Sequence, residues 1–392
     1  EGGAATGKNW ARGWRWRGGS VKEDQEANLS TLRQRSRDLA MNSPIACAAL
    51  QRRTVNVIGP GLRMRSTPDA EVLGLTPDEA TAWARVRERE FLLWARSREC
   101  EVSGLDNFDE LQQLAYLSWI MNGDCIALLT MEEATEQPYE LRVQLIEADR
   151  VCNPPGKDND PRFHDGVETD AAGRVVAYHI RSNHPLAATT IGGSAVKWTR
   201  VPVRGEESGR LNVLHLIARQ RTGQYRGIPI LAPVIENCKQ LTRYSEAELT
   251  AAVISAFITV LVKSQTPEMA IGESFAPGVV TPTESSSGSS TTTNPNEPFE
   301  LPMGSASMIA LNPDEDAEMV NPARPNAQFG AFIESVSTEI GAATDIPVEL
   351  LKLKFTSSYT AARAALLEFW KRVRIDKSAF AADFCDPIAQ EI

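Results

Sequence analysis

The chain has 392 residues, of which 41 are Lys or Arg and 51 are Asp or Glu, so its formal net charge at pH 7 is −10. This length predicts two to four domains, and 42% hydrophobic with 23% charged residues is ordinary for a soluble globular protein. The acid excess argues against a protein that binds nucleic acid over its whole surface, because such a surface must be basic to neutralise phosphates. A local basic patch is still compatible with it.

The six cysteines include no Cys-x-x-Cys pair, which argues against a zinc ribbon or a thioredoxin-like site, and their low density suits a reducing cytosol. The first twenty residues lack the apolar segment of a signal peptide. The longest apolar run, about Leu249–Val262, is too short to span a membrane, which takes about 18–20 residues. We therefore expect an intracellular protein with no membrane partner.

Residues 1–24 are expected to form an N-terminal arm rich in glycine, with tryptophans placed between arginines. Two interpretations are open. An arm of this kind can be a mobile tail, because it has no apolar periodicity of its own. Alternatively, Trp10, Trp14 and Trp16 anchor it on another protein surface, since tryptophan is enriched at interfaces.

Helices and then strands are expected in the first half of the chain. The expected helices span 28–58, 77–98 and 108–122. The second has the clearest start, with Thr76 as cap, Pro77 in the first position and Glu79 three residues after the cap. Its expected apolar side consists of Trp83, Val86, Phe91 and Trp94. A strand over 125–131 follows, and alternation with a period of two over 139–220 predicts a β-rich block.

The middle of the chain combines a long helix with a low-complexity segment. Apolar residues at three- and four-residue steps predict a helix over 230–255. Ten of the thirteen residues from Thr281 to Thr293 are Ser or Thr, a composition that cannot bury a core. A short strand at Met308–Ala310 is expected after this segment.

The last third is expected to be helical, with one interruption. A helix presents Phe329, Phe332, Ile333, Val336 and Ile340 on one face. It breaks at Asp345–Pro347, and a loop follows over Leu350–Ser358. A final helix starts near Tyr359 and is expected to bury Ala362, Leu366, Phe369, Trp370 and Val373.

The residues that usually carry chemistry form no persuasive constellation. Gly2–Lys8 has the spacing of a phosphate loop, but Asn9 stands where Ser or Thr must bind magnesium. A cluster of possible oxygen and nitrogen ligands consists of Asp158, Asp160, His164 and Asp165. We favour a solvated polar loop over a divalent-ion site there. The sequence therefore predicts no catalytic residue, no metal site and no cofactor.

Four segments, in this order along the chain, match a known family. They are Arg35–Pro44 with Val55–Gly61, Gly166–Tyr178, Val213–Leu216 with Gly223–Pro233, and Ser357–Arg363. Each is weak alone, but their number and order are fairly specific. From about residue 30 to 375 the chain resembles the portal proteins of tailed bacteriophages, of the lambda family.

The resemblance implies an α+β fold that assembles into a ring. Its implied parts are an N-terminal arm (1–24), an α/β wing (25–229), a first stem helix (230–255), a small α/β clip with the Ser/Thr-rich insert (256–325), a second stem helix (326–344), a tunnel loop (345–358) and a long helix leading toward the wing or a crown (359–392). The chain ends in a helical segment, so a crown would be absent, short or outside this sequence.

The resemblance also implies a structural protein rather than an enzyme. It implies a ring of twelve copies at one capsid vertex of the virion, assembled in the host cytoplasm, through which double-stranded DNA is packaged and ejected. The implied partners are the terminase large subunit, the head-tail connector and the major capsid protein. Twelve copies at −10 carry about −120, which would let DNA slide rather than stick. The alternatives are another connector ring (an adaptor or stopper) and, less favoured, a packaging nuclease or ATPase.

Three contact regions follow from the same resemblance. The DNA-channel loop consists of Lys352, Lys354, Phe355 and Thr356; the clip contact of Phe299, Leu301, Met308 and Ile309; and the arm against capsid or a neighbouring subunit of Trp10, Trp14 and Trp16. Two roles stay open for the two lysines. They either touch DNA phosphates transiently, without reading bases, or pair with acids of adjacent subunits.

Overall fold

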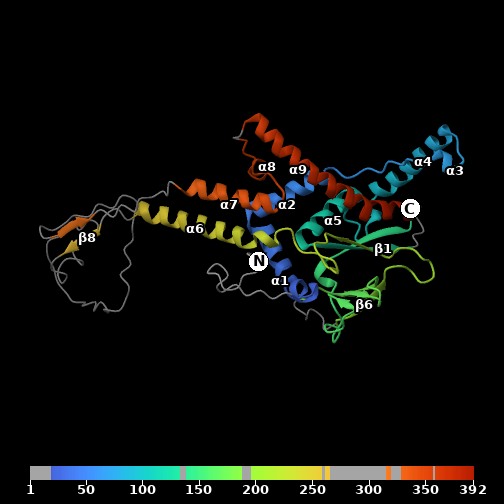
Figure 1. Ribbon diagram of the computed structural model, residues 1–392, viewed down its shortest axis with the longest axis horizontal. Coiled ribbons are helices and arrows are strands. Elements are labelled where there is room, and N and C mark those ends of the chain that lie inside the picture. The colour runs from blue at the N-terminus through green and yellow to red at the C-terminus, as the bar shows by residue number, and fades with distance from the viewer. Residues whose placement is uncertain are drawn as a thin grey trace, which may run out of the picture. The chain divides into compact units, whose positions relative to one another are not determined.

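The computed structural model describes residues 19–132, 138–187, 196–257, 261–264, 315–318, 328–355 and 358–392 (Figure 1). The chain divides into two compact units. Unit 1 comprises Glu1–Lys239 and Ser335–Ile392, and unit 2 comprises Gln240–Glu334. The described part combines many helices with two small antiparallel sheets and a two-stranded ribbon, which confirms the α+β fold class.

Unit 1 begins with the short helix η2 (Lys22–Glu26) and continues into α1 (Ala27–Asn42) and α2 (Pro44–Val57). The single helical segment expected over 28–58 is therefore two helices. The break lies at Ser43, whose backbone is extended (φ −109°, ψ 114°). Its cause is Pro44, because a residue that precedes proline is disfavoured in the helical conformation.

The next helices are α3 (Ala70–Leu73), α4 (Pro77–Arg96), the turn η3 (Arg98–Cys100) and α5 (Phe108–Asn122). The expected cap of α4 is confirmed: the Thr76 side chain accepts from the backbone N–H of Glu79, whose carboxylate accepts from the N–H of Thr76. Phe91 and Trp94 are buried as expected. Trp83 and Val86, which were expected on the same apolar side, are exposed, because the first half of α4 extends away from the rest of unit 1 (Figure 1).

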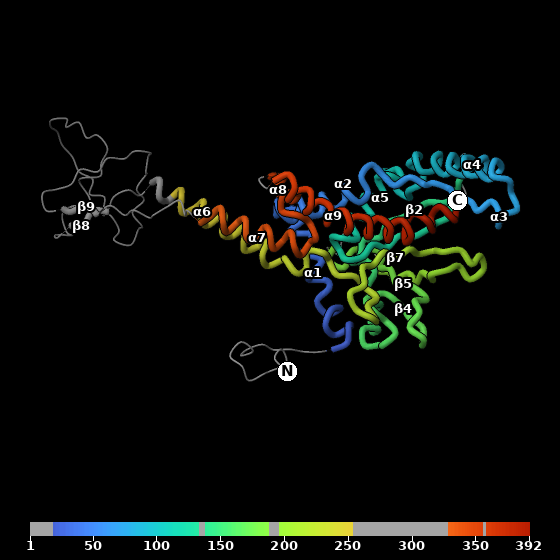
Figure 2. The backbone as a smooth tube through the Cα atoms, turned by 45° about the horizontal axis from the view of Figure 1, so that its top comes forward, coloured from blue at the N-terminus to red at the C-terminus, as the bar shows by residue number. Residues whose placement is uncertain are grey.

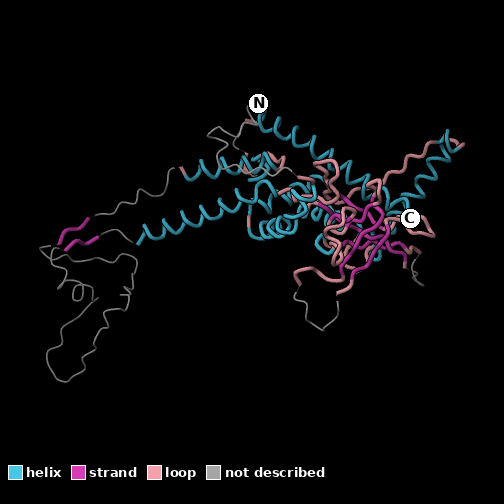
Figure 3. Tube along the Cα trace, turned by 60° about the horizontal axis from the view of Figure 1, so that its bottom comes forward, coloured by secondary structure: helices cyan, strands magenta, loops and turns pink. Residues whose placement is uncertain are grey.

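Two antiparallel sheets follow (Figure 3). In the first, β1 (Asp124–Met131) lies between β2 (Leu141–Ile146) and β7 (Val213–Ile217), with Ile126 opposite Ile146 on one side and His215 on the other. The second has the order β3 (Phe163–His164), β4 (Val167–Thr169), β5 (Val175–Arg181) and β6 (Trp198–Pro202). The turn η4 (Ala148–Arg150) follows β2. Their shared core consists of Ile126, Ile146, Val151, Val167, Tyr178, Ile180 and Val213.

The C-terminal helices of unit 1 return to its N-terminal helices. They are the end of α7 (Phe329–Ala343), α8 (Val348–Lys352), α9 (Tyr359–Phe380), η6 (Ala381–Cys385) and α10 (Asp386–Glu391). Helix α9 lies beside α2 (Figure 2), and Phe380 meets Tyr116 of α5 edge-on with ring centroids 5.9 Å apart. Phe369 and Val373 are buried as expected, but Trp370 is exposed. It lies on the flank of the helix rather than on the face toward α2.

Unit 2 contains most of α6 (Ile235–Phe257), the strands β8 (Leu261–Ser264) and β9 (Glu315–Glu318), and the beginning of α7. The short helix η5 (Ala232–Val234) precedes α6. The two strands pair antiparallel, with Leu261 opposite Glu318. The helices α6 and α7 meet through the rings of Tyr244 and Phe332, whose centroids are 4.6 Å apart. The Ser/Thr-rich segment and the expected strand at 308–310 lie outside the described residues.

Candidate functional site

The segment between α7 and α9 forms a tightly built turn. Gly341 in the last turn of α7 sits so close to the following backbone that an added Cβ would lie 2.5 Å from the carbonyl oxygen of Ile346. Asp345 then takes a left-handed conformation (φ 54°), and Pro347 precedes α8. The break expected at 345–347 is confirmed. The direction in which the chain leaves α7 depends on Gly341, a position where only glycine fits.

The expected loop begins three residues later than the sequence suggested, because residues 350–352 complete α8. Leu351 is buried and gives this short helix its anchor. Leu353 ends α8 in the left-handed region (φ 53°), which costs a non-glycine residue about 1 kcal/mol. The N–H of Lys354 then donates to the carbonyl of Glu349 (3.1 Å). The loop is thus held at its base before it leaves the protein surface.

The loop presents a cation and two large apolar side chains to solvent. Lys354 is exposed, and 56% of Leu353 and 57% of Phe355 are accessible. Lys352 is half-buried in α8 and Thr356 lies outside the described residues. Ser358 then caps α9 by accepting from the N–H of Ala361 (3.4 Å). Three of the four expected loop residues, Lys352, Lys354 and Phe355, therefore lie in one short segment. Of the two lysines, only Lys354 lies in its exposed part.

A buried ionic cluster, which we call the Arg53 hub, holds the end of α7, where this segment begins. Arg53 of α2 donates to the carbonyl of Thr344 at the end of α7 (2.9 Å) and pairs with Asp376 of α9. The hydroxyl of Tyr116 in α5 donates to the same carboxylate (2.8 Å). All four residues are buried. Burial also raises the pKa of Tyr116, so this phenol stays protonated and remains a donor.

A second buried cluster, which we call the Asp124 network, holds the start of β1. The carboxylate of Asp124 is fully buried between Arg226 (Nε–Oδ2 2.6 Å) and Arg33 of α1 (Nη2–Oδ2 3.1 Å). Arg226 donates further to the carbonyls of Val151 (2.7 Å) and Ala148 (2.8 Å). This one guanidinium therefore ties the two sheets and the segment before α6 together.

Two neighbouring cations determine the protonation state of Asp124. Burial alone would raise the pKa of Asp124, but Arg226 and Arg33 outweigh it and hold that pKa well below its usual value of 3.8. His215 lies 3.6 Å from the same carboxylate, and burial lowers the pKa of His215 below its usual 6.5. The carboxylate is therefore charged and the imidazole neutral at pH 7. Because the groups of this network point into the protein interior, we interpret the network as one that stabilises the fold.

The possible metal cluster does not come together. Its side chains have separate partners: Asp158 accepts from Asn153, Asp160 pairs with Arg162, His164 with Glu26, and Asp165 with Arg33 and Arg226. Among the described residues, no group of three or more His, Cys, Asp or Glu side chains is arranged to hold a metal ion. Asp158 is exposed, whereas Asp165 pairs with the two buried arginines of the Asp124 network and is therefore not part of a solvated loop.

Neither buried cluster was recognised from the sequence, although α2 carried a signal for one of them. Arg53 falls on the apolar face of α2, at helical spacing from its buried neighbours Ala46, Ala49, Leu50 and Val57. A charged residue on such a face requires a buried partner. No sequence pattern names that partner, because Asp376 lies 323 residues further on. The predicted contact residues Trp10, Trp14, Trp16, Phe299, Leu301, Met308 and Ile309 lie outside the described residues.

The pattern of most of the chain matches one protein family. The family described as "phage portal protein, lambda family" matches residues 7–377. The chain belongs to the lambda family of phage portal proteins. This membership confirms the resemblance inferred from the four sequence segments, and it identifies the chain as a structural component of the virion rather than an enzyme. Within the described residues, no helix is both long and apolar enough to cross a lipid bilayer.

Portal proteins of individual phages are similar along most of the chain. Portal protein B of Escherichia phage lambda is 22% identical over 368 residues, which cover 92% of this chain and 67% of that protein. The portal protein of Escherichia phage N15 is 22% identical over 371 residues, covering 92% and 68%. A probable portal protein of a Halomonas phage, phiHAP-1, is 30% identical over 158 residues, or 40% of this chain and 29% of that protein.

The portal-family chain is also similar to solved structures of gene transfer agent particles. The neck of the empty particle, computed with C6 symmetry, has a TM-score of 0.49 at 14% identity and covers 86% of this chain and 75% of that one. The neck of the native particle, computed with C12 symmetry, has a TM-score of 0.47 at 14% identity, covering 88% and 75%.

Proposed function

We propose that twelve copies of this chain form a closed ring at one vertex of the capsid, through which double-stranded DNA is packaged and ejected. Membership of the portal family over residues 7–377 carries this proposal. Two features of the chain support it. The exposed loop at 353–355 rests on a rigid buried hub, and the acid excess multiplies to about −120 in twelve copies, which disfavours tight binding of phosphate.

The parts of the chain receive the following roles in this proposal. They are the arm (1–24), the wing (25–229), the first stem helix (230–255), the clip (256–325), the second stem helix (326–344), the tunnel loop (345–358) and the helix behind it (359–392). The clip residues Phe299, Leu301, Met308 and Ile309 would contact the terminase large subunit and the head-tail connector. The tryptophans Trp10, Trp14 and Trp16 would contact the major capsid protein or a neighbouring subunit, and assembly would take place in the host cytoplasm.

The particle mass tests the ring directly. Native mass spectrometry of the purified chain is expected to give one closed species at twelve times the chain mass of 42.9 kDa. A neighbouring ring size, such as eleven or thirteen copies, would correct the number and leave the ring in place. A monomer or dimer at every salt and protein concentration would overturn the proposal.

Within the ring, we propose that Lys354 and Lys352 contact DNA phosphates transiently. Changing both to glutamine is expected to increase the loss of DNA from filled heads by up to about fivefold, since an exposed charge contact is worth about 0.2–1 kcal/mol. DNA remaining in heads after a fixed time measures this. The matched control is Lys371→Gln on α9, because Lys371 is exposed but already pairs with Glu368 (2.6 Å). Retention equal to that of the control would contradict the contact.

A further inference from the structure

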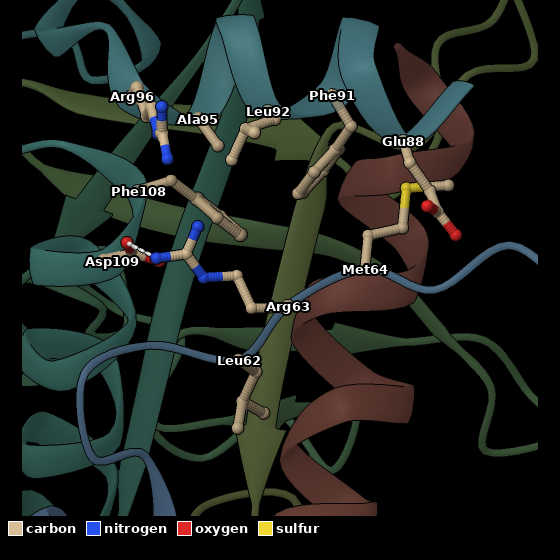
Figure 4. A pocket seen from close by; sticks show the side chains of 10 residues that line it. All are labelled: Leu62, Arg63, Met64, Glu88, Phe91, Leu92, Ala95, Arg96, Phe108 and Asp109. Atoms are coloured by element: carbon tan, nitrogen blue, oxygen red, sulfur yellow. Dashed lines mark hydrogen bonds and ion pairs between the residues drawn. The ribbon is translucent and has the colours of Figure 1, made fainter. Parts of the chain in front are cut away.

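The helix α4 borders a pocket of about 160 Å³ in unit 1, lined by apolar and charged side chains (Figure 4). Its other walls come from α5 and from the extended segment that follows α2. The ring of Phe91 meets that of Phe108 edge-on, with centroids 5.6 Å apart. A cavity of about 150 Å³ accommodates benzene, so this pocket has room for a side chain of leucine size. Leu62, Met64 and Leu92 supply further apolar lining.

The same helix has a second apolar surface, which we call the α4 stripe: Trp83, Val86 and Leu93. Their accessible fractions are 45%, 47% and 62%. At about 100° of rotation per residue, the stripe lies roughly opposite the face that lines the pocket. Three large apolar side chains in one line on a helix are costly to leave in water, where each could gain about 25 cal/mol per Å² on burial. Such a stripe indicates a protein contact.

Charged side chains border both surfaces. Two cations, Arg63 and Arg96, and two acids, Glu88 and Asp109, line the pocket. Glu79 and Glu90 lie along the stripe at helical spacing. Arg63 pairs at 3.4 Å with Asp109, and Glu90 pairs at 2.9 Å with Arg87. Arg96 forms no ion pair with any residue that the structure describes. Glu90 lies one turn from Leu93, so a stripe from another copy that brings Leu93 to the pocket would also bring this acid near Arg96.

We propose that the α4 stripe of one copy packs over the α4 pocket of the next copy, with Leu93 entering the pocket. The inference rests on the proposed ring, and it names the surface through which wings would join. Because stripe and pocket lie on opposite sides of one helix, each copy can both give and receive the contact, which is the head-to-tail arrangement that closes rings.

Leu93 and the pocket occupy the same turns of α4, and this position along the helix is compatible with the proposed contact. Rotation about a ring axis keeps both the height of a residue and its distance from the axis. A residue can therefore meet only those residues of the neighbour that occupy a similar level in the subunit. Leu93 and the α4 residues that line the pocket share the same turns, between positions 88 and 96. No shift along the helix is needed to bring them together.

Disulfide trapping tests the contact in the full chain. We pair Leu93→Cys with Met64→Cys, a pocket-lining position, and oxidise mildly before a denaturing gel without reductant. The expected result is a ladder of covalent multimers, whereas either single variant stays a monomer. The control pairs Met64→Cys with Val72→Cys, because Val72 is 81% exposed but lies on α3, away from the stripe. The native cysteines are all buried or half-buried, which limits background.

A charge in the stripe gives a second, independent readout. Leu93→Glu is expected to raise the protein concentration needed for half assembly by at least about tenfold, or 1.4 kcal/mol per contact. Leu105→Glu, at a leucine that is 70% exposed but lies off the stripe, should leave this concentration unchanged. If the wild type forms rings but the cysteine pair gives no ladder and Leu93→Glu assembles normally, this inference is overturned while the proposed function stands. A wild type that never assembles overturns both.

Discussion

Replacing Arg53 with alanine is expected to lower the free energy of unfolding by about 3–5 kcal/mol, the usual cost of removing one partner of a buried ion pair. The reason is that Asp376 would keep its buried charge with only the hydroxyl of Tyr116 and the partly exposed guanidinium of Arg372 as partners, and the carbonyl of Thr344 would lose its guanidinium. Urea unfolding followed by fluorescence measures the change. Changing Asp376 to asparagine should cost a similar amount, because it strands the Arg53 charge instead.

The control for this experiment is an ion pair of the same kind on the surface. Arg174 is 82% exposed and pairs with Asp170 at 2.8 Å, so Arg174→Ala should change the free energy by less than about 1 kcal/mol. A double variant, Arg53→Met with Asp376→Leu, should cost less than the sum of the singles, since it leaves no stranded charge. If Arg53→Ala costs no more than Arg174→Ala, the hub does not support the loop segment as described.

Changing Asp124 to asparagine is the second large effect that we expect, again about 3–5 kcal/mol at pH 7. Two buried guanidinium groups, of Arg226 and Arg33, would lose their shared counter-charge. The amide can accept hydrogen bonds from them but carries no negative charge to balance theirs. Urea midpoints of the two proteins at pH 7 measure the difference, and the control is Asp170→Asn, whose arginine partner Arg174 is 82% exposed.

The same variant should change the pH dependence of stability. The pKa of Asp124 in the folded state lies well below its usual 3.8, so the stability it contributes is present above about pH 4. That stability is lost as the pH falls below the unfolded-state pKa and toward the folded one. The difference between wild type and Asp124→Asn should therefore be largest near neutral pH and shrink in acid. A difference that stays constant from pH 7 to pH 3 would falsify the charged assignment.

The elements predicted well from the sequence are those with local signals. The start of α4 depends on Thr76, Pro77 and Glu79, which are neighbours in the chain, and their capping geometry formed as expected. The break after α7 likewise followed from Pro347. Local hydrogen bonds and fixed proline geometry do not need the rest of the protein, so such features can be read before any fold is known.

The predictions that differ from the structure concern which face of a helix is buried, and not which segments are helices. Periodicity correctly indicated that α4 and α9 are helices. It put Trp83 and Val86 on the same apolar side as Phe91 and Trp94, and it expected Trp370 to be buried, but all three are exposed. An apolar side chain on a helix marks a surface that avoids water, and the pattern does not distinguish a core from a contact with another copy. The exposed α4 stripe is such a surface.

The sequence by itself determined the family and the secondary structure of this portal protein. The order of four weak motifs sufficed for the family, and local caps and periodicity sufficed for most helices and strands. Only the tertiary structure revealed the Arg53 hub, the Asp124 network and the paired surfaces of α4. The physical reason is distance along the chain. Arg53 and Asp376 are 323 residues apart, and Arg33 and Asp124 are 91 apart, so folding alone brings these charges together.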